Sequence, residues 1–164
     1  IVNIAKTVIE KQKNILFIVA GAKGTMTNLV EDAAKNSNNQ IKSLVDFPFD
    51  KLPQLYQVAD LLIAPTVSKQ ACMGVAVKEA MSSGIPALVT NSGGLPEAIR
   101  NNIDGYVIPL KKNEMPDDDS FIKKIIRIQK DKNKMSRMGK SARKRAIEVF
   151  SNETMLDNYI KLLS

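Results

Sequence analysis

Short apolar runs alternate along the chain with longer segments whose apolar residues recur at helical spacing. Ile15–Ala20 is entirely apolar and is followed by Gly21, a pattern typical of a parallel strand buried on both faces. In Ile1–Gln12 the apolar positions follow the helical period, which predicts a helix. The whole pattern predicts strands at 15–20, 41–47, 61–64, 87–90 and 106–108, and helices at 1–12, 27–35, 52–59, 75–83, 95–100, 120–130, 134–150 and 153–163.

This alternation is typical of the α/β class. It predicts one domain over residues 1–164, a Rossmann-like parallel sheet with helices on both faces, followed by C-terminal helices. Ligands of such sheets bind at the carboxyl ends of the strands. Asp50 is the expected cap of the helix at 52–59. The first helix has no visible start, so we expect the chain to be a piece of a longer protein.

The composition narrows the chemistry that the chain can perform. It has 164 residues, no histidine and one cysteine, Cys72. This excludes histidine triads, histidine bases, clustered Cys/His metal sites and an internal disulfide within these residues. We therefore expect no metal site built on histidine or clustered cysteine. The near-absence of cysteine favours a reducing, cytoplasmic location.

Positive charge is concentrated near the C-terminus. Residues 111–148 hold 13 Lys/Arg and 6 Asp/Glu, which accounts for the whole net charge of +7. One interpretation is a solvated helix face, and another is contact with an anionic membrane, the inner face of the plasma membrane. Nucleic acid is not an expected partner, because aromatic residues are only 5%, tryptophan is absent and no nucleic-acid motif accompanies the charge.

A polar loop between the strand at 61–64 and the helix at 75–83 is the first candidate site. Gly74 immediately before the helix allows close approach of a ligand to the backbone. The free N–H groups of Gly74, Val75 and Ala76, with the helix dipole behind them, predict a phosphate or pyrophosphate site at the helix start. An ordinary loop with a glycine before a helix remains the alternative.

Glu79 lies one turn into the same helix, among apolar neighbours. Helical side chains tilt toward the N-terminus, so this carboxylate could reach the ribose hydroxyls of a nucleotide held at the helix start. A plain surface glutamate is the alternative. A second glycine turn, Gly93-Gly94, follows the strand at 87–90 and offers further free N–H groups at the same sheet edge.

Taken together, these segments resemble the C-terminal, donor-binding half of GT-B fold glycosyltransferases of the family 4 type. The resemblance covers most of the chain and depends on the order and spacing of several segments, of which none is specific alone. These are Leu52–Asp60, Pro65-Thr66, Met73–Pro86, Thr90–Glu97 and Asp104–Pro109, with the tail from Met138 to Ser151.

The resemblance implies a UDP- or GDP-sugar as substrate, with its diphosphate on Met73–Val75 and its ribose on Glu79. It also implies an N-terminal acceptor domain outside this chain, retention of anomeric configuration, and neither a metal site nor a cofactor. The base and the sugar are expected near residues 45–47, residues 70–72 and the glycine turn at 93–94. These residues are Val45, Asp46, Phe47, Gln70, Ala71, Cys72, Gly93 and Gly94.

One position departs from the family pattern. The family has two glutamates seven residues apart, and the first falls at Ala71, so Gln70 is the nearest polar substitute. Two main hypotheses follow. The chain is either the donor-binding part of a glycosyltransferase, with no catalytic residue of its own, or a catalytically degenerate module that binds a partner or a membrane. A sugar-nucleotide epimerase or a phosphorylase of the same fold is a third option.

Overall fold

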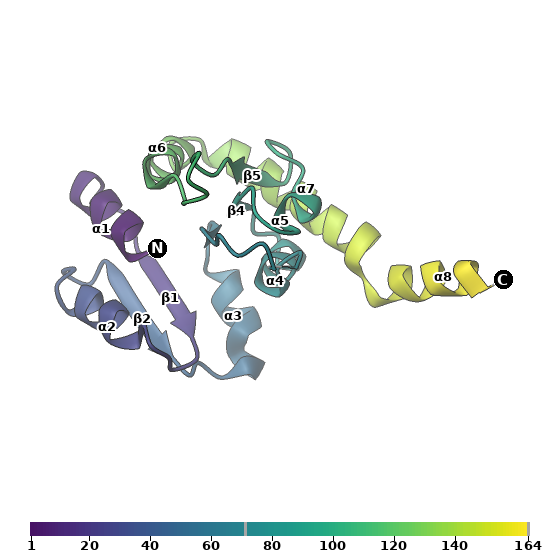
Figure 1. The fold of residues 1–164 in the computed structure, drawn as a ribbon, viewed down its shortest axis with the longest axis horizontal. Helices are drawn as coiled ribbons and strands as arrows, with labels where there is room; N and C mark the ends of the chain where they lie inside the picture. The colour runs from purple at the N-terminus through teal and green to yellow at the C-terminus, as the bar shows by residue number, and fades with distance from the viewer. Residues whose placement is uncertain (71, 164) are drawn as a thin grey trace.

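The structure is a computed structural model that describes residues 1–70 and 72–163. Within them the strands form two parallel sheets (Figure 1). β1 (Phe17–Gly21) pairs with β2 (Ile41–Val45). β3 (Leu62–Ala64), β4 (Ala87–Thr90) and β5 (Gly105–Ile108) form the second sheet, with β4 in the centre. The α/β class and the parallel pairing are as predicted, but the single sheet is found in two parts.

Helices cover both sheets and extend beyond them (Figure 1). Three short ones belong to the loops and connections, namely η1 (Phe49–Lys51, a 3-10 helix), α3 (Leu52–Gln57) and α5 (Leu95–Ala98). The others are α1 (Val2–Lys11), α2 (Thr27–Lys35), α4 (Val75–Ser82), α6 (Asp118–Ile128), α7 (Lys132–Phe150) and α8 (Asn152–Leu163).

Some element boundaries differ from the prediction for local reasons. β2 ends at Val45 rather than at Phe47, because Asp46 has a left-handed backbone (φ 50°) that no strand accommodates. Asp50 does not cap α3: it lies inside η1, and Lys51 is the N-cap residue, without a side-chain cap. Asp131 caps α7, its carboxylate accepting a hydrogen bond from the Lys134 N–H at 2.9 Å.

The apolar side chains form two buried clusters. The larger one joins α1 and α6 to residues of both sheets, including Phe17 of β1 and Leu88 of β4. The second lies between β4, α4, α5 and α7. All four residues of β4 are buried, because this strand has a neighbour on each side and helices on each face.

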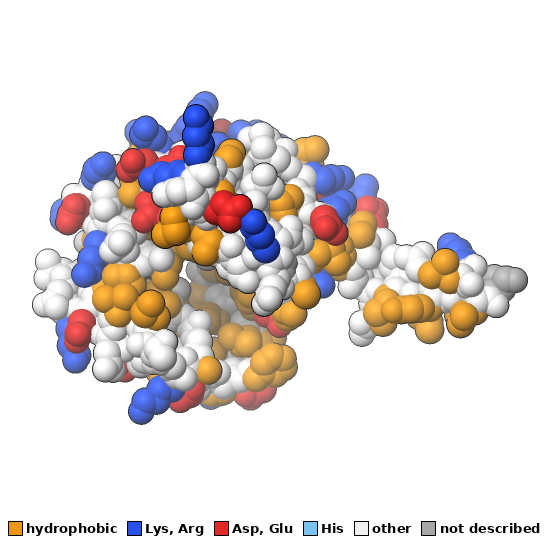
Figure 2. All heavy atoms as spheres, viewed as in Figure 1, with side chains coloured by type: hydrophobic (Ala, Val, Ile, Leu, Met, Phe, Trp, Pro, Cys, Tyr) orange, Lys and Arg blue, Asp and Glu red, His pale blue; other side chains and the backbone are white. Residues whose placement is uncertain are grey.

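α8 extends away from the rest of the chain (Figure 1). None of its residues is buried, and apolar side chains gather along one side of it in the space-filling view (Figure 2). In the part of the chain that the structure describes, no helix combines the length and the apolar character that crossing a membrane requires.

Candidate functional site

The start of α4 presents unpaired backbone N–H groups. Gly74 caps the helix with φ 68°, and the first helical hydrogen bond of α4 runs from the Lys78 N–H to the Gly74 carbonyl at 3.2 Å. The N–H groups between these two residues therefore have no helical acceptor, and Val75 and Ala76 are exposed. A side chain on Gly74 would lie 2.9 Å from Leu95 Cδ2, so the tight turn requires glycine.

The two glycine loops predicted to share a sheet edge are in contact. A Cβ atom on Gly94 would lie 3.0 Å from the backbone nitrogen of Met73 and 3.2 Å from the carbonyl carbon of Cys72. Two buried hydroxyls strengthen the junction: Thr90 donates to the Thr66 carbonyl, and Ser92 donates to the Ser68 carbonyl at 3.2 Å. The loop after β4 thus holds the loop after β3 in place.

Glu79 is held by a tyrosine of another helix. The Tyr56 hydroxyl, on α3, donates a hydrogen bond to Glu79 Oε2 at 2.9 Å. Burial, followed by this bond and the carboxylate charge, raises the pKa of Tyr56 well above its usual value. Glu79 is half-buried and uses one carboxylate oxygen for Tyr56, so Oε1 remains available as an acceptor for a ligand.

The loop after β3 is anchored at a further point. Lys69 Nζ lies 2.7 Å from Glu114 Oε1, which ties this loop to the segment that precedes α6. Gln70 and Cys72 are exposed, and the Cys72 sulfur lies 4.0 Å from the Gln70 carbonyl. Ala71, the position of the expected first glutamate, lies outside the described residues.

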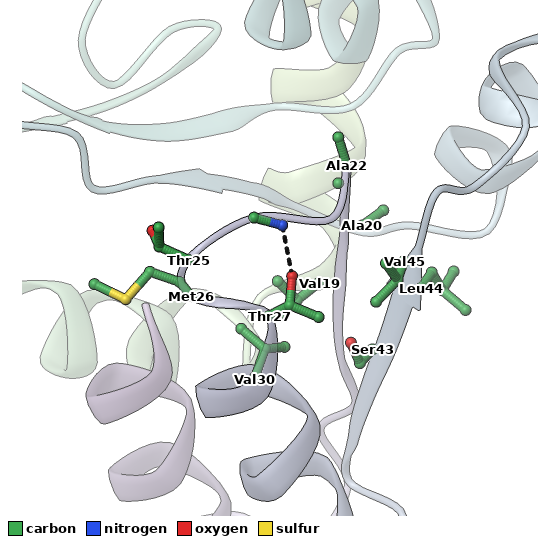
Figure 3. Close-up of a pocket in the computed structure, with 12 residues that line it drawn as sticks. Val19, Ala20, Ala22, Thr25, Met26, Thr27, Val30, Ser43, Leu44 and Val45 are labelled. Atoms are coloured by element: carbon green, nitrogen blue, oxygen red, sulfur yellow. Dashed lines mark hydrogen bonds between the residues drawn. The ribbon is translucent and has the colours of Figure 1, made fainter.

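A cavity of about 260 Å³ opens at the carboxyl ends of β1 and β2 (Figure 3). Val45 lines it together with Leu44 and Ser43 of the same strand, and Val30 of α2 faces it from the other side. The loop between β1 and α2 also lines the cavity, and within it the Gly24 N–H donates a hydrogen bond to Thr27 Oγ1 at 2.8 Å. Neither Asp46 nor Phe47 lines the cavity.

Asp46 and Phe47 have other positions in the structure. The Asp46 carboxylate accepts a hydrogen bond from the Lys23 N–H at 2.9 Å, so it fastens the end of β2 to the loop after β1. Phe47 is half-buried, just before η1. The candidate residues therefore form two groups. Met73, Gly74, Val75 and Gly94 meet at one place with Glu79 one turn away, whereas Val45 belongs to the cavity of the other sheet.

Sequence reasoning missed Tyr56 as a partner of the site. Tyr56 lies in a segment that carries the family resemblance, but no local pattern indicates that it contacts Glu79, 23 residues away. An available signal was that a tyrosine near an apolar strand needs a hydrogen-bond partner when it becomes buried.

Part of the basic C-terminal segment serves internal packing. Arg145 donates to the carbonyls of Ala98 and Glu97, both at 2.9 Å, and Arg143 donates to the Ser82 carbonyl. Asp104 is fully buried, and its carboxylate pairs with Arg100 at 2.9 Å and lies 3.7 Å from Arg145. Within residues 1–70 and 72–163, no three His, Cys, Asp or Glu side chains are grouped so as to hold a metal ion.

Known proteins resemble this chain over most of its length. The family described as glycosyl transferases group 1 matches residues 1–145. An α-1,3-galactosyltransferase of Escherichia coli, which acts with UDP-Gal on GlcNAc-diphosphoundecaprenol, is 27% identical over 90% of this chain and 36% of its own length. N-acetyl-α-D-glucosaminyl L-malate synthase of Bacillus anthracis is 28% identical over 94% of this chain and 38% of its own length.

Solved structures share the fold. HepE of Anabaena, in complex with UDP-glucose, superposes with a TM-score of 0.79 at 19% identity, over 98% of this chain and 44% of that one. The C-terminal domain of a group 1 glycosyltransferase from Francisella tularensis gives a TM-score of 0.76 at 16% identity, over 92% of this chain and 77% of that one. The chain spans less than half the length of the curated relatives named above. It belongs to the group 1 glycosyltransferases and has the α/β fold of the C-terminal domain of GT-B enzymes.

Proposed function

We propose that this chain is the donor-binding domain of a glycosyltransferase. The enzyme transfers a sugar from a UDP- or GDP-sugar to an acceptor, with retention of anomeric configuration and without a metal ion. The acceptor site and the catalytic residues belong to an N-terminal domain of the same polypeptide. This chain supplies the donor pocket and no catalytic residue, and residues 1–164 alone are inactive in transfer.

One observation supports this proposal above the others: the contact between Gly94 and the backbone of Met73 at the start of α4. It places unpaired N–H groups of α4 beside the loop after β4, at the carboxyl edge of the sheet where α/β folds bind nucleotides. Glu79 lies one turn further into α4. N–H groups that can bind a diphosphate, with a carboxylate one helical turn away that can accept hydrogen bonds from ribose hydroxyls, suit a nucleoside diphosphate.

Each residue then has a defined role. The N–H groups of Met73, Gly74 and Val75 bind the diphosphate and, with the positive end of α4, stabilise it as it departs with the developing negative charge. Glu79 accepts hydrogen bonds from the ribose hydroxyls, and Tyr56 orients its carboxylate. The base and sugar contact Gln70, Ala71, Cys72, Gly93 and Gly94 in the loops beside this point, and Val45, Asp46 and Phe47 at the end of β2 in the other sheet.

Nucleotide titration of the full-length enzyme tests the proposal. Isothermal titration with UDP, GDP and ADP should show binding of one nucleotide in preference to the others. Glu79→Gln should lower the affinity for that nucleotide about tenfold or more, because a charge-assisted hydrogen bond contributes about 1.5–3 kcal/mol. Glu97→Gln, an exposed glutamate on α5, is the matched control and should leave the affinity unchanged. Equal affinities of the two variants and the wild type would contradict the role of Glu79.

A degenerate module of the same fold is the second candidate, and Ala71 in place of a glutamate is the observation that favours it. Such a module would bind a partner or an anionic membrane through the basic segment 111–148. In that case the full-length protein would show no nucleotide binding at millimolar concentration. It would instead bind vesicles of anionic lipid, and binding would weaken as salt is raised.

A further inference from the structure

A second cavity, of about 200 Å³, lies where β5 meets α6 and α7. β5 lies beside both helices (Figure 1). The cavity is lined by Asn102, which precedes β5, by Tyr106 of β5, and by residues from the later part of α6 and the start of α7. It is therefore at the amino end of β5. The loops at Gly74 and Gly94 follow the carboxyl ends of β3 and β4, at the opposite edge of the sheet.

The charges that line this cavity are unbalanced. Three cationic side chains, Lys124 and Arg127 of α6 and Lys134 of α7, face a single acidic residue, Asp131. The Asp131 carboxylate is already in use as the cap of α7, where it accepts a hydrogen bond from the Lys134 N–H. None of the three cations forms an ion pair with a residue that the structure describes. The cavity therefore carries an excess of positive charge.

The ring of Tyr106 holds two of these cations close to it. Lys124 Nζ lies 4.4 Å from the ring centroid, and Lys134 Nζ lies 5.6 Å from it. The negative face of an aromatic ring attracts cations, which offsets part of the repulsion between the two ammonium groups. Burial, followed by the charges of Arg127 and Lys134, lowers the pKa of Lys124. The repulsion among the three cations is thus only partly relieved by the protein itself.

The Tyr106 hydroxyl is available to a ligand. Only 2% of Tyr106 is exposed, and its hydroxyl makes no hydrogen bond with a residue in the described part of the chain. Within the same residues, no side-chain oxygen that is sealed from solvent lacks a partner, so this hydroxyl has access to the cavity that Tyr106 lines. A buried tyrosine hydroxyl usually has a hydrogen-bond partner, and here a bound molecule can provide it.

The position of Lys134 is unfavourable for the helix that carries it. Lys134 lies in the first turn of α7, which contains no acidic residue. The positive end of the helix dipole disfavours a cation in this turn. Helix stability therefore does not account for a lysine at this place. An anion in the cavity would be attracted both by the lysine and by the helix dipole, and would remove the conflict.

We propose that this cavity binds a phosphate group, carried by a small soluble phosphate compound or by the headgroup of a phospholipid. A phosphate dianion has enough charge and enough oxygens for three cations and one hydroxyl donor, whereas a carboxylate has one charge and two oxygens. Pockets that take drug-sized ligands measure about 300–1,000 Å³, so this smaller cavity suits the phosphate group and not a whole nucleotide. The proposal does not depend on the proposed function.

NMR of the isotope-labelled full-length protein, titrated with inorganic phosphate at constant ionic strength in chloride, tests the proposal. The backbone amides of Asn102, Tyr106 and Lys134 should shift together along one saturating curve at millimolar phosphate. Any change at Gly74 would report the other edge of the sheet and follow its own curve. If these three amides responded neither to phosphate nor to vesicles that contain phosphatidic acid, the proposal would be overturned.

Two substitutions test the cavity itself. Lys124→Met and Tyr106→Phe keep most of the apolar volume of each side chain and remove a donor, so each should lower the phosphate affinity about tenfold. Lys123→Met is the matched control, because Lys123 is exposed on the same helix and does not line the cavity. Equal losses in Lys123→Met and Lys124→Met would show that general surface charge attracts the anion, which would overturn the proposal.

Vesicles of phosphatidylcholine with phosphatidic acid distinguish the two sources of the phosphate group. Sedimentation with these vesicles that Lys124→Met reduces, and that inorganic phosphate inhibits, would identify a lipid headgroup. Saturable phosphate binding without sedimentation would identify a soluble compound. Sedimentation that Lys123→Met reduces as much as Lys124→Met would again indicate surface charge alone and contradict the proposal. The readouts are at β5, α6 and α7, so failure of the donor-site proposal leaves this test unaffected.

Discussion

Two features of the structure at the start of α4 require glycine at position 74. Its backbone is left-handed, and a Cβ atom would lie 2.9 Å from Leu95 Cδ2 and 3.1 Å from Val77 Cγ2. We expect Gly74→Ala to lower the free energy of unfolding by about 1–3 kcal/mol through backbone strain and overpacking. Urea denaturation measures this. Gly24→Ala is the control, because the nearest atom there is 4.0 Å away. Equal effects of the two substitutions would show that position 74 is neither strained nor tightly packed.

Tyr56 makes the stability of the folded protein depend on pH. Its pKa is raised from 10.0 in the folded state, mainly by burial and then by Glu79, so the folded protein retains the phenolic proton more tightly than the unfolded chain. The resulting stability is complete below pH 10.0 and is lost as the pH rises above it. Tyr56→Phe removes this dependence together with about 1 kcal/mol of hydrogen-bond energy at neutral pH.

The difference in unfolding free energy between the wild type and Tyr56→Phe should therefore shrink above pH 10.0. Urea denaturation at a series of pH values measures it, and the subtraction cancels the titration of lysines. Tyr159→Phe serves as the control, because Tyr159 is 60% exposed. The series should reach about pH 11, roughly one pH unit above the usual tyrosine pKa. A difference that stays constant over this whole range would show that the Tyr56 hydroxyl is not buried against Glu79.

At the scale of elements, α7 packs closely against the turn that follows α4. A Cβ atom on Gly139 would lie 2.2 Å from the Gly84 carbonyl oxygen, so alanine there forces α7 away from α4. Alanine is normally favoured over glycine inside a helix by about 1 kcal/mol. We nevertheless expect Gly139→Ala to destabilise the protein by about 1–3 kcal/mol.

Thermal unfolding of Gly139→Ala beside Ser136→Ala measures this effect. Ser136 lies on the exposed face of the same helix, and its substitution should be neutral or slightly stabilising. If Gly139→Ala were as stable as Ser136→Ala, α7 would not pack as closely on α4 as the structure shows.

At the scale of the whole molecule, α8 lies outside the two buried clusters. None of its residues is buried, and it packs against α7. Ending the chain after Ser151 should therefore change the free energy of unfolding by less than about 1 kcal/mol, because little apolar area becomes exposed. Urea denaturation of the shortened and complete chains gives the comparison. A loss of more than about 2 kcal/mol would mean that α8 folds onto the core.

The separation of the sheet into two parts is also a property of the whole molecule. The apolar pattern of 15–20 predicts a parallel strand buried on both faces, whereas in β1 only Phe17 is buried. The pattern is correct about the strand and says nothing about which other segment lies beside it. Pairing partners are set by the path of the chain through space, which local periodicity does not record.

The sequence by itself determined the class of fold, the position of nearly every helix and strand, and the glycines that mark the loops at Gly74 and Gly94. These features depend on local period, local backbone freedom and short-range packing, which neighbouring residues encode. The tertiary structure alone decided that Tyr56 holds Glu79, that Gly94 meets Met73, and that Val45 belongs to a separate cavity. Each of these contacts joins residues far apart in the chain, and their distances depend on how strands and helices pack, which a one-dimensional pattern does not record.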